Sequence, residues 1–149
     1  MKTLIILIWI FVSQICNGQS LILSGDDDHG IMYNFVLETY LKEKLSTHVD
    51  NSILIEYNYF TTRDLPSKIG EVKINQVEVT KKLFKDKKHI TILRMVPLRF
   101  IDGKFAIIII EYDAHYDRKK NNINLINTEN GKRFEFVHDC IKNELISTF

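Results

Sequence analysis

The order of apolar and polar residues predicts one helix near the start of the folded region. From His29 to Leu45, apolar and aromatic residues recur at the i, i+3, i+4, i+7 spacing that gathers them on one face of an α-helix. Charged residues occupy the opposite face, and Asp28, just before the segment, is of a type that caps helices. The predicted apolar face consists of Tyr33, Val36, Leu37, Tyr40, Leu41 and Leu45.

The rest of the chain has patterns typical of β-strands. Apolar or aromatic residues stand at every second position from Ile53 to Tyr59, which predicts a strand with one buried face. Residues 72–84 fit either a strand or a helix, and their β-branched residues favour the strand. Four further segments rich in β-branched and aromatic residues are 89–101, 104–112, 121–127 and 132–139.

Asp102-Gly103 predicts a tight hairpin between two long strands. This dipeptide favours a two-residue type I′ turn, in which both residues have positive φ. Counting back from such a turn places Arg94 opposite Glu111. Pro97 removes a donor from the ladder, and a bulge there would shift this register.

Asn130-Gly131 predicts a second hairpin of the same type, which pairs residues 121–127 with residues 132–139. Residues 105–110 are apolar at every position, so we expect a central strand covered on both faces. The sequence therefore predicts an α+β fold: one N-terminal amphipathic helix packed on a curved antiparallel sheet, a meander of about five to six strands.

The first 18 residues are expected to form a signal peptide. Lys2 precedes an almost unbroken apolar run from Leu4 to Val12, and cleavage after Gly18 fits best. The run is shorter than the roughly 17 to 25 residues of a membrane-spanning helix, so no span is expected after cleavage. A lipoprotein anchor at Cys16 is a less favoured alternative. We expect export to the periplasm or the exterior, a flexible lead-in over residues 19–28, and a single domain over residues 29–149.

The chain that remains after cleavage has no net charge. Lys2 is the only charged residue in the signal peptide, so 19 of the 20 cationic residues remain beside 19 acidic ones. A neutral chain lacks a basic excess, so nucleic acid is not an expected partner. Cys140 remains alone and forms no intramolecular disulfide. The five lysines between Lys81 and His89 indicate either a surface for anions or a solvated hairpin end, and we favour the latter.

Titratable residues follow the apolar strand and form the candidate site. In an extended strand, those at every second position after residue 110 share one face, and the second predicted hairpin brings residues 138–140 to the same end. Carboxylates and imidazoles on one face fit general acid–base catalysis or cation binding. Alternatively, the strand simply leaves the core here. The candidate catalytic residues are Glu111, Asp113, His115 and His138, and the candidate metal ligands are Asp113, His115 and Asp117.

No nucleophile motif, metal-ligand spacing or phosphate-binding loop accompanies this cluster, so no cofactor or resident metal is expected. The favoured hypothesis is a non-enzymatic interaction module of the bacterial envelope or exterior, whose partner is another envelope or secreted protein. The first alternative is a small hydrolase or metal-dependent enzyme that uses Glu111, Asp113 and His115. The second is a carrier of an apolar ligand between helix and sheet, lined by Tyr57, Tyr59, Phe134 and Phe136.

Overall fold

The computed structural model describes residues 29–45, 51–141 and 144–149. The signal peptide and lead-in predicted for residues 1–28 lie outside these ranges. Within them, helix α2 (His29–Leu45) comes first, and a short 3-10 helix, η2 (Lys81–Phe84), lies between the third and fourth strands. The strands are β1 (Ser52–Glu56), β2 (Lys68–Ile69), β3 (Val72–Val77), β4 (His89–Ile101), β5 (Lys104–Asp117), β6 (Asn122–Asn127), β7 (Lys132–Asp139) and β8 (Glu144–Ser147).

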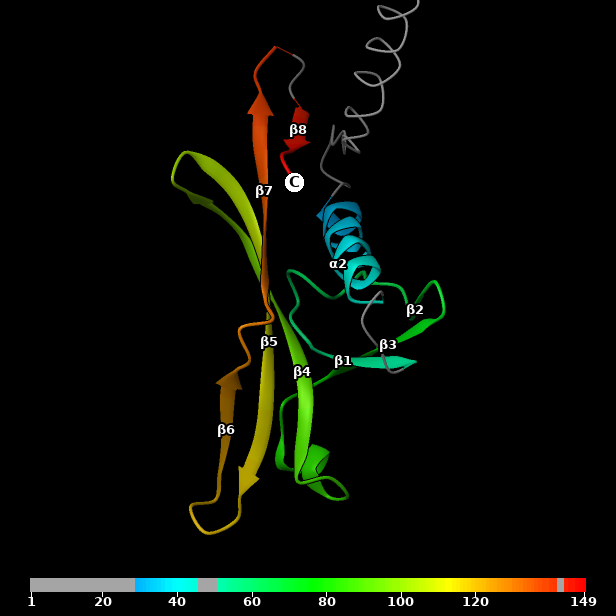
Figure 1. The fold of residues 1–149 in the computed structure, drawn as a ribbon, viewed down its shortest axis with the longest axis vertical. Coiled ribbons are helices and arrows are strands. Elements are labelled where there is room, and N and C mark those ends of the chain that lie inside the picture. Colours follow the sequence, from blue (N-terminus) through cyan, green and yellow to red (C-terminus); the bar gives the residue numbers. More distant parts are fainter. Residues whose placement is uncertain (1–28, 46–50, 142–143) are drawn as a thin grey trace, which may run out of the picture.

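The strands form one open sheet in which α2 covers part of one face (Figure 1). The order is β2-β3-β1-β4-β5-β7-β8, and β6 also pairs with β5. The sheet is larger than the predicted meander, and it is mixed, because β1 is parallel to both β3 and β4. The expectation of a purely antiparallel sheet is therefore wrong. Residues 57–71 connect β1 to β3, and residues 78–88 connect β3 to β4. Both connections are long enough for the chain to return in the same direction, which a two-residue hairpin does not allow.

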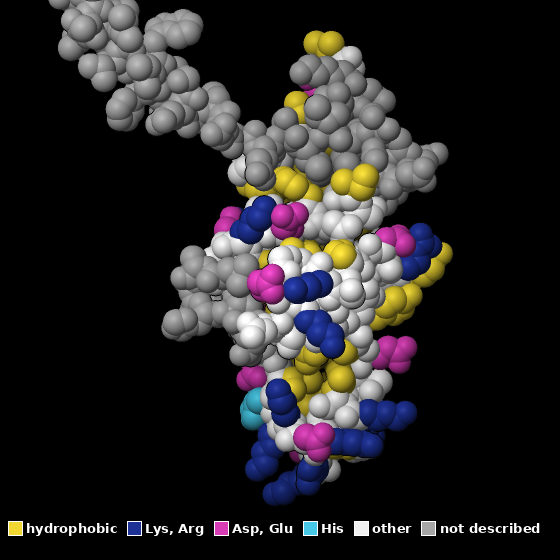
Figure 2. Space-filling view, turned by 90° about the vertical axis from the view of Figure 1, so that its right-hand side faces the viewer, with side chains coloured by type: hydrophobic (Ala, Val, Ile, Leu, Met, Phe, Trp, Pro, Cys, Tyr) yellow, Lys and Arg dark blue, Asp and Glu magenta, His cyan; other side chains and the backbone are white. Residues whose placement is uncertain are grey.

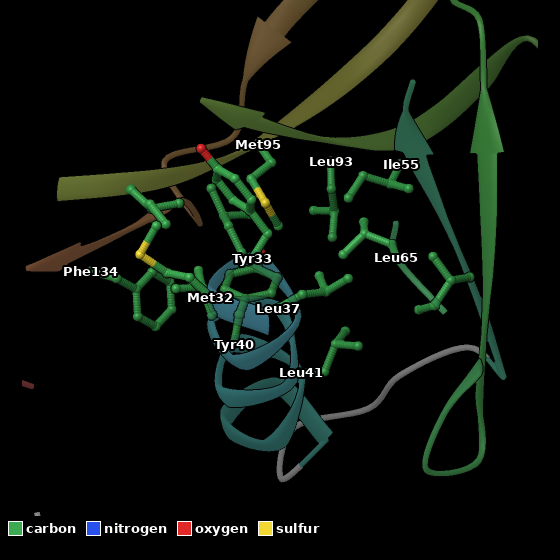
Figure 3. Packing of buried hydrophobic residues seen from close by; sticks show 14 of the residues in the cluster. Met32, Tyr33, Leu37, Tyr40, Leu41, Ile55, Leu65, Leu93, Met95 and Phe134 are labelled. Atoms are coloured by element: carbon green, nitrogen blue, oxygen red, sulfur yellow. The ribbon is translucent and has the colours of Figure 1, made fainter. Parts of the chain in front are cut away.

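The predicted helix face packs against the sheet as its main core. Tyr33, Val36, Leu37, Tyr40 and Leu41 are all buried, which confirms the periodicity, and the side chain of Leu45 lies outside the described residues. Figure 3 shows side chains of α2 reaching toward those of β1 and β4. Sheet residues in this cluster include Ile55, Leu93, Met95, Ile107, Ile109, Phe134 and Phe136.

A second, smaller core lies on the opposite face of the long strands. Ile90 and Ile92 of β4 alternate with Leu93 and Met95, so they point away from α2. They pack with Phe84, the last residue of η2, and with Ala114 of β5. Strand β5 is central, as predicted, but its two faces are covered at different points along its length, and Ile108 and Ile110 remain half-buried.

The β4–β5 hairpin has the predicted turn and a shifted register beyond it. Asp102 and Gly103 have φ values of 53° and 80°, as a type I′ turn requires. The register changes between Val96 and Arg99, around Pro97. Arg94 consequently lies opposite Ile110 rather than Glu111.

Arg94 instead links β4 to β1. Its guanidinium forms a two-pronged ion pair with Glu56, and the Nη2–Oε1 distance is 3.1 Å. Its carbon Cζ also lies 5.0 Å from the ring centre of Tyr112. The ladder between β1 and β4 has a single residue pair, Ile55 with Leu93, so this ion pair reinforces a short junction.

The predicted hairpin at Asn130-Gly131 is absent from the described residues. Strands β6 and β7 pair with β5 one after the other along the same edge, instead of with each other. Gly131 has no positive φ, and its role is different: a Cβ there would lie 2.6 Å from the carbonyl oxygen of Ile109. The glycine therefore allows the chain to pass close to β5 between the two strands.

We expect Gly131→Ala to lower the free energy of unfolding by about 2–3 kcal/mol, because backbone atoms must move to admit the methyl group. Gly70→Ala is the control, since Gly70 has a φ of 56° but open space around it. That change costs only the left-handed backbone strain, about 1 kcal/mol. Urea denaturation measures both values, and an equal loss in the two variants would show that the close approach is not the constraint.

Candidate functional site

Glu111 is the most deeply buried titratable residue of the predicted cluster, with 6% of its surface exposed. Thr128 Oγ1 and Asn130 Nδ2 each donate to its Oε1 at 3.0 Å. The hydroxyl of Tyr40 lies 3.3 Å from Oε2, and the ammonium of Lys44 forms an ion pair with the same oxygen. A buried carboxylate needs such partners, because its desolvation is otherwise very costly.

These contacts join three parts of the fold around one carboxylate. Tyr40 and Lys44 come from the last turns of α2, and Thr128 and Asn130 come from the segment between β6 and β7. Burial raises the pKa of Tyr40 to about 12. Burial also lowers the pKa of Lys44. Because four donors surround its two oxygens, Glu111 is best placed to hold the helix end to the sheet.

The other predicted residues continue along the same face of β5 into more exposed surroundings. His89 lies opposite His115 in the ladder, and their rings stack with centres 5.4 Å apart. His89 Nδ1 is 3.4 Å from a carboxylate oxygen of Asp113, and Asn124 Nδ2 is 3.1 Å from His115 Nε2. Asp117 accepts hydrogen bonds from the backbone of the turn that follows it. The strand alternation therefore brings Asp113 and His115 beside a histidine that was not predicted.

His138 is not part of this group. Strand β7 begins beside Ile109 and runs toward Phe105, so His138 lies toward the opposite end of β5 from Asp113. The prediction that residues 138–140 gather with Glu111 is wrong, because it depended on the β6–β7 hairpin. His138 Nδ1 instead lies 3.6 Å from the sulfur of the exposed Cys140. Across the described residues, no three His, Cys, Asp or Glu side chains are grouped so that they could hold a metal ion.

A hollow of about 460 Å³ adjoins Glu111 between the end of α2 and the start of β4. Lys44, Lys87 and His89 line it, together with Tyr40 and apolar residues of β1 and β4. Of the two stacked histidines, only His89 lines this hollow, and its side chain is 64% exposed. Its amines and imidazole give it a basic character, and Glu111 at its wall is already occupied by Lys44.

A second hollow, the aromatic cleft, lies at the other end of α2 and has a volume of about 410 Å³. The turn that follows β1, the first turn of α2 and the middle of β4 meet here. Its walls are mainly apolar, and its rim carries aromatic side chains beside an arginine. Tyr33, Leu65, Pro97 and Leu98 form the walls, and Tyr59, Phe60 and Arg63 form the rim.

The turn after β1 is a rigid platform for this rim. Three hydrogen bonds join Asn58 and Thr62. The Asn58 N–H donates to Thr62 Oγ1 at 2.7 Å, and the hydroxyl and backbone N–H of Thr62 donate to the Asn58 carbonyl at 3.0 and 2.9 Å. The Asn58 side chain also accepts the N–H of Phe60 at 2.9 Å. Thr61 is buried and donates to the carbonyl of Met95 in β4 at 3.3 Å. These bonds fix the turn to the sheet while its aromatic side chains remain outside.

The β4 bulge builds the floor of the cleft. Pro97 has no N–H, and the ladder to β5 is interrupted around it. The N–H of Leu98 instead bonds to the hydroxyl of Tyr33 at 3.1 Å. The Tyr33 side chain thus accepts a hydrogen bond from an amide that the bulge removes from the ladder. This bond also fixes α2 beside the cleft.

The rim is open to solvent. Phe60 is 73% exposed and Tyr59 is 58% exposed, and their rings meet edge to face at 5.6 Å. The guanidinium of Arg63 lies 4.8 Å from the ring centre of Tyr59 and donates to its hydroxyl at 2.8 Å. Hydrogen bonding to Asp64 raises the pKa of Arg63. The aromatic rim is therefore held in place before any partner binds.

Sequence reasoning did not find the aromatic cleft. The alternation from Ile53 to Tyr59 predicted one continuous strand, whereas β1 ends at Glu56. The signal that could have found the turn is local: the segment from Asn58 contains Thr61 and Thr62 and ends at Pro66, a composition typical of turns.

No protein-family model, curated protein or solved structure matches the chain. No helix within the described ranges is long and apolar enough to span a membrane.

We expect Tyr40→Phe to change how stability depends on alkaline pH. The pKa of Tyr40 is raised from 10.0 to about 12 in the fold. The stability that Tyr40 contributes to the fold is therefore fully present below pH 10 and is lost as the pH rises through 12. In urea denaturation, the free energy of unfolding of the wild type should fall between pH 9 and 12. The fall should be roughly 1–2 kcal/mol smaller in the variant. Tyr57→Phe, which alters an exposed tyrosine, should keep the wild-type profile, and identical profiles for all three proteins would contradict the expectation.

We expect Glu111→Gln to lower the free energy of unfolding at pH 7 by about 1–3 kcal/mol, because it removes the buried negative charge that pairs with Lys44 and accepts hydrogen bonds from Thr128 and Asn130. Asp113→Asn is the matched control, two residues along the same face of β5. Its carboxylate is 42% exposed, so its loss should cost less than about 0.5 kcal/mol. Equal effects in urea denaturation would argue against a special role of Glu111.

Proposed function

We propose that the protein is an exported, non-enzymatic binding module that recognises another protein through the aromatic cleft. The single observation that carries this proposal is the rim, where two exposed aromatic rings and an arginine stand on a turn fixed by buried and partly buried hydrogen bonds. Tyrosine, phenylalanine and arginine are enriched in protein interfaces. A preformed rim also loses little conformational entropy when a partner binds.

The chemistry of the cleft favours a peptide segment that presents one bulky apolar side chain. The walls around Tyr33, Leu65 and Leu98 are apolar, and a volume of about 410 Å³ lies at the small end of the range of ligand sites, roughly 300–1,000 Å³. Such a site suits an anchor side chain, with Tyr59 and Phe60 covering the segment on either side of it.

Export is proposed from the apolar run and cleavage pattern of the first 18 residues alone.

The two alternative functions have less support. A hydrolase that uses Glu111 needs a carboxylate free to accept a proton from substrate, and the oxygens of Glu111 face four donors of the protein itself. A carrier needs its predicted lining residues around one cavity, but Phe134 and Phe136 are fully buried in the core and line neither hollow. Its other predicted lining residues, Tyr57 and Tyr59, are on the surface.

A selected peptide tests the proposed function. Random twelve-residue peptides displayed on phage are selected against the purified protein, and an enriched peptide is synthesised for calorimetry. We expect an apolar anchor residue in the enriched peptides. We also expect Phe60→Ala to weaken binding by at least about tenfold, the usual effect of removing a central interface side chain.

Phe100→Ala provides a matched control, because Phe100 is 66% exposed and also packs edge to face on a neighbouring ring, 5.2 Å away. It lies next to the β4–β5 turn and is not part of the aromatic cleft. Its loss should leave the affinity within about twofold of the wild type. Equal affinity of the peptide for the wild type and Phe60→Ala, or a loss confined to Phe100→Ala, would reject the cleft as the binding site.

A further inference from the structure

One end of the molecule collects positive charge that the overall composition conceals. Residues 81–89 and 117–121 contain eight cationic and two acidic side chains, an excess of six positive charges, whereas the whole chain carries +1. The rest of the chain is therefore net negative. We call these two segments the basic tip. Its exposed cations are Lys81, Lys82, Lys85, Lys87, Lys88, Arg118, Lys119 and Lys120.

The fold brings the two segments of the basic tip together although about 30 residues separate them in sequence. His89 pairs with His115 at the end of the β4–β5 ladder, so η2 and the β5–β6 turn lie at the same end of the sheet. Lys81 Nζ donates to Asn121 Oδ1 at 2.5 Å and lies 5.9 Å from the ring centre of Tyr116. Figure 2 shows Lys and Arg side chains gathered at this lower end of the molecule.

The basic tip has its own apolar anchor. Phe84 is buried, and its ring lies 6.3 Å from that of Tyr116 on β5. Together with Ile90, Ile92 and Ala114, these residues form the second core cluster and its border. The fold therefore holds these cations close together although they repel one another. In a free tail the same cations would move apart.

We propose that the basic tip docks the protein on the surface of a lipid bilayer that contains anionic lipids. The tip lies at one end of the longest axis of the molecule (Figure 1), so a flat surface can touch it without meeting the net-negative remainder. Each lysine or arginine near an anionic bilayer contributes about a fivefold change in binding, until salt screens it. The opposite charge of the remainder turns the tip toward the membrane.

The composition of the basic tip favours lipid headgroups over nucleic acid. Seven of its eight cations are lysines, which act as hydrated point charges, and only Arg118 has the planar fork that binds a single phosphate in two places. Stacking of bases needs exposed aromatic rings, whereas Phe84 is buried and Tyr116 is half-buried beneath Lys81. Within the two segments, no large apolar side chain is strongly exposed, so binding depends on charge and is sensitive to salt.

Vesicle co-sedimentation with the full chain tests this proposal. The probes are phosphatidylcholine vesicles with and without 30% phosphatidylglycerol, at low and high salt. We expect the anionic vesicles to bind more protein than the neutral ones, and this difference to vanish at high salt. Any contact made by the apolar N-terminal run is common to both vesicle types, so the difference isolates the contribution of charge.

Two variants with the same charge change locate the surface. The tip variant replaces Lys82, Lys88, Lys119 and Lys120 by glutamine and retains Lys81, which bonds within the fold. The control variant replaces four exposed cations elsewhere, Lys42, Lys68, Lys73 and Arg99, by glutamine. The tip variant should lose the preference for anionic vesicles on the order of 100-fold, and the control variant less than about fivefold. Thermal unfolding checks that both remain folded.

Several results would overturn the proposal. Equal losses in the two variants would show that net charge, not the basic tip, determines binding. Equal binding of the wild type to neutral and anionic vesicles would remove the role of charge. Binding to heparin or single-stranded DNA that depends on the tip, without binding to anionic vesicles, would assign the surface to a polyanion instead. None of these results affects the aromatic cleft, which shares no residue with the basic tip.

Discussion

The length of β5 relative to α2 is the constraint on which the rest of the structure depends. Strand β5 has 14 residues and extends about 46 Å at roughly 3.3 Å per residue. Helix α2 has 17 residues and extends only about 25 Å at 1.5 Å per residue. One helix therefore covers only part of the central strand, and the remainder must be stabilised by other contacts. Two strands in series along one edge of β5, and a second core on its opposite face, meet this need.

Glu111 lies where the cover of the helix ends. Ile107 and Ile109 precede it on the same face and are fully buried under α2, whereas Asp113 and His115 follow it in partly exposed positions. A carboxylate at this boundary can bond to the last turns of the helix and also to the segment that separates β6 from β7. The polar residues that seemed in sequence to form a catalytic cluster are thus explained in part by the change from core to surface.

The helix and the first hairpin could be predicted because local physics decides them. The face of α2 follows from residue spacing, and Asp102-Gly103 adopts its turn because both residues tolerate positive φ. Asn130-Gly131 has the same local preference, but long-range pairing overrode it. The free edge of β5 extends past Glu111 and offers separate partners to β6 and β7, so Gly131 serves as a point of close approach. The length of that edge depends on the tertiary fold, so it could not be deduced from the spacing of turn residues in the sequence.

The candidate sites were harder to predict, because each combines segments that are distant in sequence. The aromatic cleft needs the bulge at Pro97, the hydroxyl of Tyr33 and the turn around Asn58 in one place. The basic tip needs residues 81–89 beside residues 117–121, which follows only from the β4–β5 register.

The neutral net charge indicated that the protein has no basic surface, and this was misleading. A neutral total arises equally from charges that are mixed and from charges that are separated in space. The separation has a spatial consequence for function. Eight residue steps along β4, from His89 to Pro97, set the basic tip roughly 26 Å from the bulge beneath the aromatic cleft. If the tip rests on an anionic bilayer, the cleft is held above the surface at about that height and clear of the headgroups. A partner protein could then reach Tyr59 and Phe60 without displacing the lysines, so the two proposed contacts are compatible and can form together.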